Sequence, residues 1–123
     1  MKQVYESRKC KIFEIDEGYI YKIYPRNRQN QELGTSKIFA NKEKCKEAYV
    51  EFKQYVLNNK VNSAENNCIS IEKTKSEKDI PKYRYICKIN DENIFYQRYV
   101  DSMENCKKGV KSLYNTLEYI YKK

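Results

Sequence analysis

The feature that most constrains the fold of this chain is an internal duplication. Residues 19–23 read YIYKI and residues 85–89 read YICKI, and an amphipathic helix follows each copy. The two helices correspond without a gap, through the pairs Cys45 and Cys106, Ala48 and Gly109, and Phe52 and Leu113. A repeated strand-and-helix unit of this size is too small to bury a core alone. We therefore expect one domain over residues 1–123, in which two copies share a core.

The first copy is expected to span about residues 9–58. Alternating apolar residues and turn signals predict three strands, at residues 9–15, 19–24 and 32–39. Asn41 is a good N-cap for a helix that runs to about Leu57. The polar stretch 59–67 is the expected linker to the second copy.

The second copy is expected to span about residues 68–123. Its predicted strands are residues 68–72, 82–89 and 92–100, with a polar loop at 73–81 and a helix capped by Ser102. Each copy is therefore β-β-β-α. The fold class predicted is α+β: an antiparallel sheet with both helices packed on one face, leaving the other face for solvent or a partner.

Several positions resemble the YegP-like family of small tandem-repeat proteins. Residues 18–23 resemble the turn and aromatic strand of that family, Thr35 and Ser36 match its third strand, and residues 106–113 are similar to its second helix. The turn at residues 90–91 reads Asn-Asp, where the family often has Asn-Gly. The resemblance implies a two-repeat α+β fold. It implies no enzymatic activity, cofactor or binding residue.

Composition restricts where the protein works and what it meets. The 123 residues carry a net charge of +8, which favours anionic partners. The N-terminus turns polar at once, and no apolar stretch is long enough for a membrane span, so no membrane association is expected. Five Cys in no paired pattern are typical of a reducing compartment. We expect a cytoplasmic protein.

Residue types needed for catalysis are missing or scattered. The chain has no His, which removes the commonest general base, and its Cys form no C-x-x-C pair. Cys45 and Cys106 occupy the same slot of both helices, which predicts buried, inert thiols. The three Gly make no phosphate-binding loop. The sequence therefore predicts no enzyme, no cofactor and no metal site.

The candidate binding residues are cations on the repeated strands and on one hairpin tip. If the alternating tyrosines 19, 21, 83 and 85 face the core, the opposite face carries Lys22, Arg84 and Lys88. If the faces are reversed, those tyrosines beside Lys and Arg would resemble a base-stacking platform. Arg26 and Arg28 form a basic tip that could bind phosphate or carboxylate.

Without catalytic groups, a small basic domain acts by occupying a surface. We expect a non-enzymatic binding module for a protein or nucleoprotein complex. Its concrete version is a small inhibitor such as a phage anti-defence (anti-CRISPR) protein, because Lys, Asn, Ile and Tyr bias is typical of AT-rich bacterial and phage genomes. One alternative is direct RNA or DNA binding through the basic sheet face. Another is a YegP-like structural protein, dimeric through an exposed strand edge.

Overall fold

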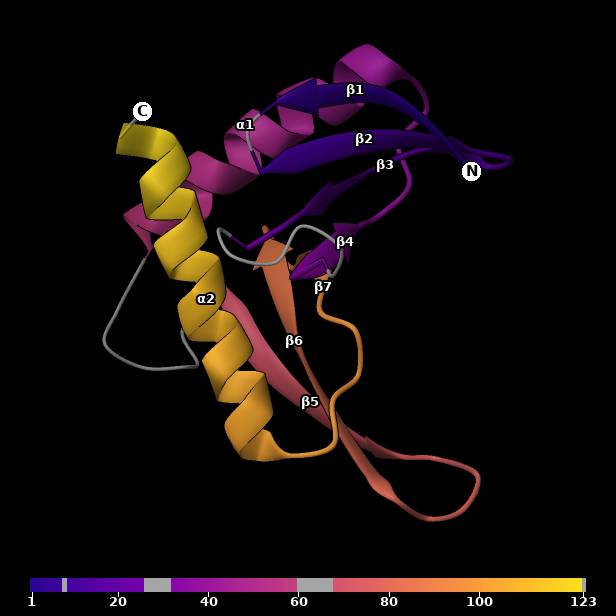
Figure 1. The fold of residues 1–123 in the computed structure, drawn as a ribbon, viewed down its shortest axis with the longest axis vertical. Helices are drawn as coiled ribbons and strands as arrows, with labels where there is room; N and C mark the ends of the chain where they lie inside the picture. The colour runs from indigo at the N-terminus through magenta and orange to yellow at the C-terminus, as the bar shows by residue number, and fades with distance from the viewer. Residues whose placement is uncertain (8, 26–31, 60–67, 123) are drawn as a thin grey trace.

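The computed structural model describes residues 1–7, 9–25, 32–59 and 68–122 (Figure 1). They form one antiparallel sheet and two helices, which confirms the α+β class. The elements are β1 (Lys2–Ser7), β2 (Cys10–Ile15), β3 (Gly18–Ile23), β4 (Gly34–Ser36), α1 (Lys42–Asn58), β5 (Ile69–Lys75), β6 (Pro81–Ile89), β7 (Glu92–Tyr96) and α2 (Met103–Lys122).

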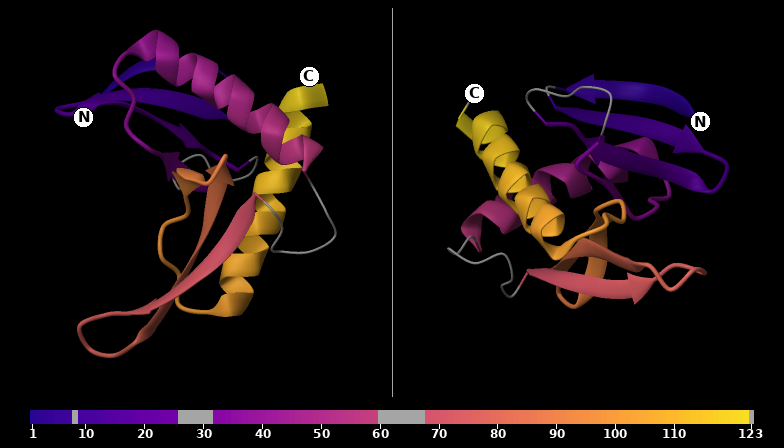
Figure 2. Two further views of the ribbon diagram at one scale, coloured as in Figure 1. Left: turned by 180° about the vertical axis from the view of Figure 1, so that it is seen from behind. Right: turned by 60° about the horizontal axis from the view of Figure 1, so that its bottom comes forward.

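The sheet is continuous because its two shortest strands, β4 and β7, pair with each other. Its seven strands lie in the order β1-β2-β3-β4-β7-β6-β5. At the centre, β4 pairs with β7 through Thr35 opposite Tyr96 and Ser36 opposite Phe95. The outer part of the β5–β6 hairpin projects from the body of the molecule (Figures 1 and 2). β4 and β7 are thus the seam at which the N-terminal and C-terminal halves of the sheet meet.

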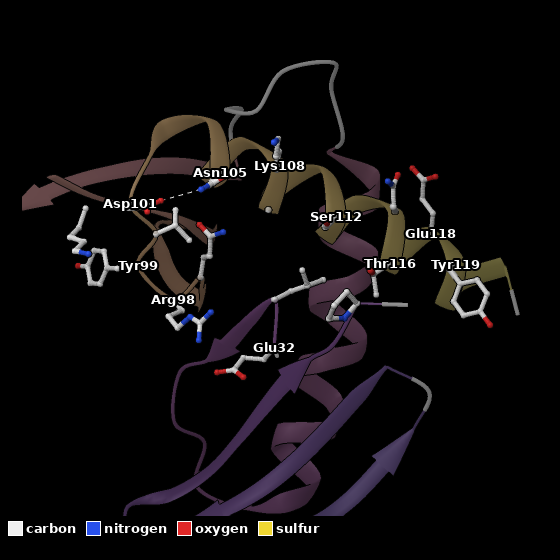
Figure 3. Close-up of a pocket in the computed structure, with 17 residues that line it drawn as sticks. Glu32, Arg98, Tyr99, Asp101, Asn105, Lys108, Ser112, Thr116, Glu118 and Tyr119 are labelled. Carbon is white, nitrogen blue, oxygen red and sulfur yellow. Dashed lines mark hydrogen bonds between the residues drawn. The ribbon is translucent and has the colours of Figure 1, made fainter. Parts of the chain in front are cut away.

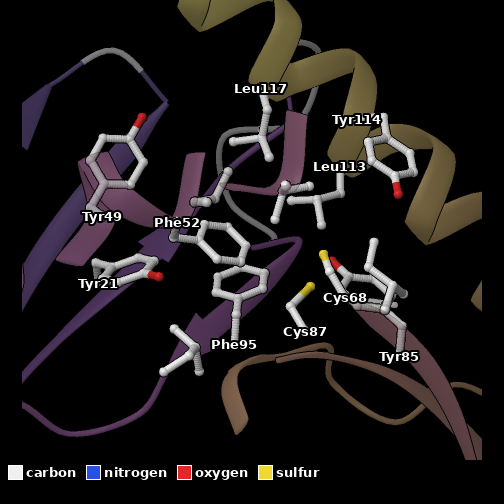
Figure 4. Packing of buried hydrophobic residues seen from close by; sticks show 14 of the residues in the cluster. Tyr21, Tyr49, Phe52, Cys68, Tyr85, Cys87, Phe95, Leu113, Tyr114 and Leu117 are labelled. Atoms are coloured by element: carbon white, nitrogen blue, oxygen red, sulfur yellow. The ribbon is translucent and has the colours of Figure 1, made fainter. Parts of the chain in front are cut away.

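Both helices lie on the sheet face that carries Tyr21, Tyr85 and Phe95. The Phe52 ring of α1 lies 4.8 Å from the Phe95 ring, and Gly109 of α2 lies against Tyr85. The rings of Tyr21 and Tyr85 stack on either side of Phe95, at 5.9 and 6.4 Å between centroids (Figure 4). Side chains from both halves therefore form one hydrophobic cluster across the seam.

Local signals explain where the helices begin and where one hairpin turns. The backbone N–H of Lys44 donates to Asn41 Oδ1 at 2.8 Å, and that of Asn105 donates to Ser102 Oγ at 3.0 Å. Both predicted N-caps are confirmed, and each satisfies a helix donor that has no partner within the helix. Asn90 and Asp91 both have positive φ, at 52° and 66°, as a tight hairpin turn requires.

The expected strand pattern is wrong in the first half. That half has four strands, because residues 2–7 form β1, an edge strand paired with β2. β1 was not predicted, since its residues are polar or only half buried and give little apolar alternation. The expected strand over 32–39 shortens to β4, with Phe39 joined to Tyr19 by an isolated bridge.

The second half also differs from expectation at its hairpin arm. The predicted loop 73–81 shortens to residues 76–80, because β5 extends to Lys75, which pairs with Pro81 at the start of β6. The expected strand over 92–100 ends at Tyr96, and Val100 forms an isolated bridge with Tyr83. Residues 73–75 are exposed and polar, which is typical of a loop, although their backbone continues the β5–β6 ladder.

The expected match between residues 19–23 and 85–89 is wrong by two positions. Tyr19 bridges to Phe39 and Tyr83 bridges to Val100, so Tyr19 has its counterpart at position 83. The backbone N–H of Tyr21 donates to Ser36 Oγ, and that of Tyr85 donates to Gln97 Oε1. The two Tyr-Ile-x-Lys-Ile runs look alike in sequence, but their hydrogen bonds match only after one run is shifted by two residues. The sequence does not reveal this shift, because tyrosines lie on the core face with or without it.

Candidate functional site

The orientation of the sheet tyrosines decides which face can meet a partner. Tyr21 and Tyr85 are fully buried beneath the helices, whereas Tyr19 and Tyr83 are half buried. The preferred prediction, that these tyrosines face the core, is therefore confirmed for Tyr21 and Tyr85. A base-stacking platform built on them is excluded, because the helices cover their rings.

Lys22 lies on the opposite face but is already engaged. Its Nζ lies 3.6 Å from Glu32 Oε1 and 5.7 Å from the centre of the Phe13 ring. The side chain is only 17% exposed. A cation held between a carboxylate and a ring offers little charge to an incoming phosphate.

Arg84 is held more tightly by its neighbours. Its Nε lies 3.1 Å from Glu72 Oε1, and its guanidinium carbon lies 5.1 and 4.6 Å from the Tyr96 and Tyr99 ring centres. The Tyr99 hydroxyl also donates to Glu72, at 2.5 Å. The hydrogen bond from Tyr99 has the largest effect on the pKa of Glu72, and Arg84 adds to it. Both lower that pKa and so keep the carboxylate charged. Arg84 is thus part of a closed cation–aromatic–carboxylate cluster.

The remaining predicted cations are Lys88, Arg26 and Arg28. Lys88 is half buried on β6, beside the irregular pairing at Cys87 and Lys88. Arg26 and Arg28 lie outside the described residues. In the sheet, Lys22 pairs with Thr35 of β4, and Thr35 pairs with Tyr96 of β7. These uncharged residues lie between Lys22 and β6. Of the described candidates, Lys22 and Arg84 are thus each paired with a carboxylate, and their strands are separated by β4 and β7.

A groove of about 1230 Å³ runs beside α2 and is the candidate site (Figure 3). One wall is the polar side of α2. The other wall is made by the segment between β7 and α2, together with Pro25 and Leu33, which flank the β3–β4 connection. The α2 residues that line the groove run from Asn105 to Tyr119.

The α2 wall is a regular polar stripe. Its lining side chains recur every three or four residues, which places them on one side of a helix: Asn105, Lys108, Ser112, Asn115 and Tyr119. At 1.5 Å rise per residue, this stripe extends for about 21 Å. Asn and Ser side chains can each donate and accept hydrogen bonds, so the stripe can pair with polar groups of either kind.

Buried contacts fix the opposite wall and the floor. The Tyr85 hydroxyl donates to the backbone carbonyl of Leu33 at 2.8 Å, which holds that segment against the sheet. Gln97 is 8% exposed, and its Oε1 accepts from the backbone N–H of Tyr85 at 3.2 Å. A Cβ at Gly109 would lie 2.2 Å from Gln97 Nε2, so the helix approaches closely only because residue 109 has no side chain. The groove is therefore built on the rigid core.

Charges around the groove are balanced. Among the described residues that line it, three are cations (Lys82, Arg98 and Lys108) and three are carboxylates (Glu32, Asp101 and Glu118). Glu32 pairs with Lys22, and Asp101 accepts from the amide of Asn105 at 3.1 Å. A surface of this kind suits hydrogen bonding with a polar chain better than binding of a polyanion.

The cysteine thiols are shielded from solvent. All five Cys are buried, as the helix positions of Cys45 and Cys106 predicted. Burial raises the pKa of Cys45 to about 12 and that of Cys68 to about 11, because desolvation disfavours the thiolate. Among the described residues, no three His, Cys, Asp or Glu side chains are grouped as a metal site would require.

Sequence reasoning missed the groove because it considered only the apolar stripe of the last helix. The polar residues 105, 108, 112, 115 and 119 repeat with the same period and were visible in the sequence. What the sequence did not show is that residues 97–101 and Leu33 lie opposite them. That juxtaposition depends on the β4–β7 seam.

Comparisons of the chain with known proteins found no match. No protein-family model, no curated protein and no solved structure matches it. Neither helix, over its described residues, is long and apolar enough to cross a membrane.

Proposed function

We propose that the chain is a non-enzymatic protein-binding module that uses the α2 groove to recognise a protein in the cytoplasm. The observation that carries the proposal is the difference between two surfaces. On the sheet face, Lys22 and Arg84 are paired with carboxylates, whereas the groove is open and its described lining residues are polar and balanced in charge. Protein interfaces use such mixed polar surfaces, while binding to a nucleic-acid backbone needs uncompensated cations.

A narrower version of the proposal is an inhibitor that masks a functional surface of a larger complex, as an anti-CRISPR protein would. The absence of His and the burial of every Cys support action by occupancy rather than by chemistry. An inhibitor of this type needs only a stable fold and one specific surface.

We also propose that β2-β3-β4-α1 and β5-β6-β7-α2 are diverged copies of one unit, as in the YegP-like family. In support, Ser36 and Gln97 accept from equivalent backbone N–H groups, and the two N-caps precede helices with Cys at the same offset. β1 and the longer α2 are then additions to the repeat.

The test is affinity capture of host proteins on the tagged chain, with and without nuclease. A protein retained after nuclease treatment supports the proposal. Capture that disappears with nuclease, together with a gel shift of free RNA or DNA that weakens steeply with salt, contradicts it in favour of the nucleic-acid alternative.

One observation favours that alternative. The β5–β6 arm carries Lys75, Lys78 and Lys82, and none of them has a carboxylate within 4.0 Å among the described residues. A gel shift lost in the variant Lys75→Ala with Lys78→Ala, whose two lysines lie outside the groove, would assign nucleic-acid binding to this arm.

A further inference from the structure

We propose that the groove holds an extended segment of the partner protein, with an acidic side chain of that segment at the end where α2 begins. This inference rests on the proposed protein-binding function and specifies the chemistry of what is bound. Three properties of the groove support it: its length, its hydrogen-bonding groups and the uneven distribution of its charges.

The length of the groove fits a short extended chain. The stripe from Asn105 to Tyr119 extends for about 21 Å along α2, and an extended chain rises about 3.3 Å per residue, so about six residues would lie along it. A second helix would be a poor occupant, because a helix with its side chains is about 10 Å wide and packs through apolar ridges. The stripe of α2 is polar.

Side chains of the stripe can satisfy the main chain of such a segment. An extended segment outside a sheet exposes N–H and C=O groups, and burying them without partners costs free energy. Asn105, Ser112 and Asn115 present donors and acceptors at intervals along the groove. Ser112 and Asn115 have no hydrogen bond or ion pair with other described residues, so they can pair with a bound chain.

The charges give the groove a direction. Arg98 and Lys108 lie toward the end where α2 begins, and Glu118 and Tyr119 lie at the other end (Figure 3). Lys82 belongs with the first group, because its neighbour Tyr83 bridges to Val100 just before α2. The positive end of the helix dipole adds to the same potential. This end therefore attracts a carboxylate.

The cations at this end are available for a new partner. Arg98 is exposed and has no ion pair with a described carboxylate. Lys108 pairs with Glu104 at 3.5 Å, but the two side chains are 70% and 79% exposed, and such a pair is weak. Asp101 also lines this end, where its carboxylate accepts a hydrogen bond from the Asn105 amide and has no ion pair with Arg98 or Lys108 among the described residues. An acidic residue of the bound segment can thus form ion pairs without displacing a buried contact.

The experiment selects ligands from a library of random octapeptides displayed on phage, using the intact chain. Selected sequences are made as fluorescent peptides blocked at both ends, so that only side chains carry charge. We expect Asp or Glu to be enriched near one end, and replacing those residues by Gln to weaken binding by about tenfold or more in fluorescence anisotropy. No selection of peptides, or selection without acidic residues, would overturn the inference.

Charge reversal locates the binding site. Arg98→Glu with Lys108→Glu should weaken the acidic peptide by about tenfold or more and bind a Lys-substituted peptide better than the unmodified chain does. The matched control is Lys75→Glu with Lys78→Glu on the β5–β6 arm, which changes the net charge equally but lies outside the groove. Equal effects of the two double variants would overturn the groove assignment.

A second variant and a competitor separate this inference from the proposed function. Ser112→Phe should block the groove while circular dichroism shows an intact fold. If this variant still captures the host partner from nuclease-treated extract, the groove inference fails and the protein-binding function stands. If the unmodified chain captures no protein, the function itself fails. Displacement of the peptide by a short oligonucleotide at equal concentration overturns both.

Discussion

The side chain of Gln97 fills the space that a side chain at position 109 would need. A Cβ on Gly109 would lie 2.2 Å from Gln97 Nε2, while Gln97 Oε1 accepts from the backbone N–H of Tyr85. The amide cannot move aside without giving up that hydrogen bond. Gly109 therefore stands in the middle of a helix because of one particular neighbour, although Gly is a poor helix former.

The corresponding positions of the first half use another combination. There Ser36 accepts from the backbone N–H of Tyr21 at 2.9 Å, and the helix residue three positions after the buried Cys is Ala48. The half with the short side chain of Ser36 thus has Ala48 on its helix, and the half with the longer side chain of Gln97 has Gly109.

Gly109→Ala should therefore destabilise the protein by about 1–3 kcal/mol, although Ala by itself favours a helix by about 1 kcal/mol. Adding Gln97→Ser, which copies the Ser36 and Ala48 combination, should recover most of that loss. Urea denaturation of the single and double variants measures both effects. A double variant no more stable than Gly109→Ala would contradict the steric explanation.

Removing single hydroxyl groups from two buried tyrosines should have opposite effects. Tyr85→Phe deletes the hydrogen bond to the Leu33 carbonyl and should cost about 1 kcal/mol. The Tyr21 hydroxyl is buried and has no partner among the described residues, so Tyr21→Phe should be neutral or stabilising. Both rings are fully buried, so each variant controls for the other in the same denaturation experiment. Equal losses would contradict this assignment.

The tight turn between β6 and β7 should accept Gly. Asp91 has a φ of 66°, and Gly is the preferred second residue in turns with two positive φ values. We expect Asp91→Gly to raise the free energy of unfolding by about 0.5 kcal/mol, because relief of backbone strain exceeds the added freedom of the unfolded chain. A matching change at Glu17, in the β2–β3 turn, should bring no gain, since the positive φ there belongs to Gly18. A loss of stability in Asp91→Gly would contradict the prediction.

Stability should fall above pH 9 as the unfolded chain ionises its thiols. The ordinary Cys pKa is 9.0, and burial raises that of Cys68 to about 11. A raised folded-state pKa means that the stabilising contribution is complete below the unfolded pKa. It is lost as pH rises toward the folded value, at up to about 1.4 kcal/mol per pH unit for each thiol. Urea titrations at pH 8, 9 and 10 should show the fall, and Cys68→Ala should make it less steep. An unchanged slope in that variant would contradict the prediction.

The cluster around Arg84 predicts a pH effect of the opposite sign. Hydrogen bonding from Tyr99 and the charge of Arg84 hold the pKa of Glu72 below its usual value. The carboxylate therefore stabilises the fold above its unfolded pKa, and this contribution is lost as pH falls through the lower folded value. Tyr99→Phe should raise the Glu72 pKa toward 4.5, as followed by NMR titration. An unchanged pKa would show that Arg84 alone sets it.

The elements with strong periodicity could be predicted from the sequence. Both helices, both caps and the central strands β3 and β6 follow from apolar spacing and from Asn41 and Ser102. β1 and the last three residues of β5 could not, because edge strands bury too few side chains to produce an alternating pattern. The residue-to-residue match of β3 with β6 failed for a related reason: a shift of two leaves every side chain on the same face.

The candidate site was harder to predict than the fold. Individual cations such as Lys22 and Arg84 were identified, but their carboxylate partners Glu32 and Glu72 come from other strands or connections. A sequence shows which residues carry charge. It does not show which of those charges are already neutralised by residues that are distant along the chain.

The shortness of the seam between β4 and β7 has a consequence for how the molecule unfolds. Two residue pairs join the half-sheets, while Phe95 at the seam packs on Tyr21 and Phe52 from the other half. Either half alone would present an unpaired strand and half of a core, and so would be driven to dimerise with a second copy. Neither half can thus unfold without exposing the strand edge and the apolar side chains of the other.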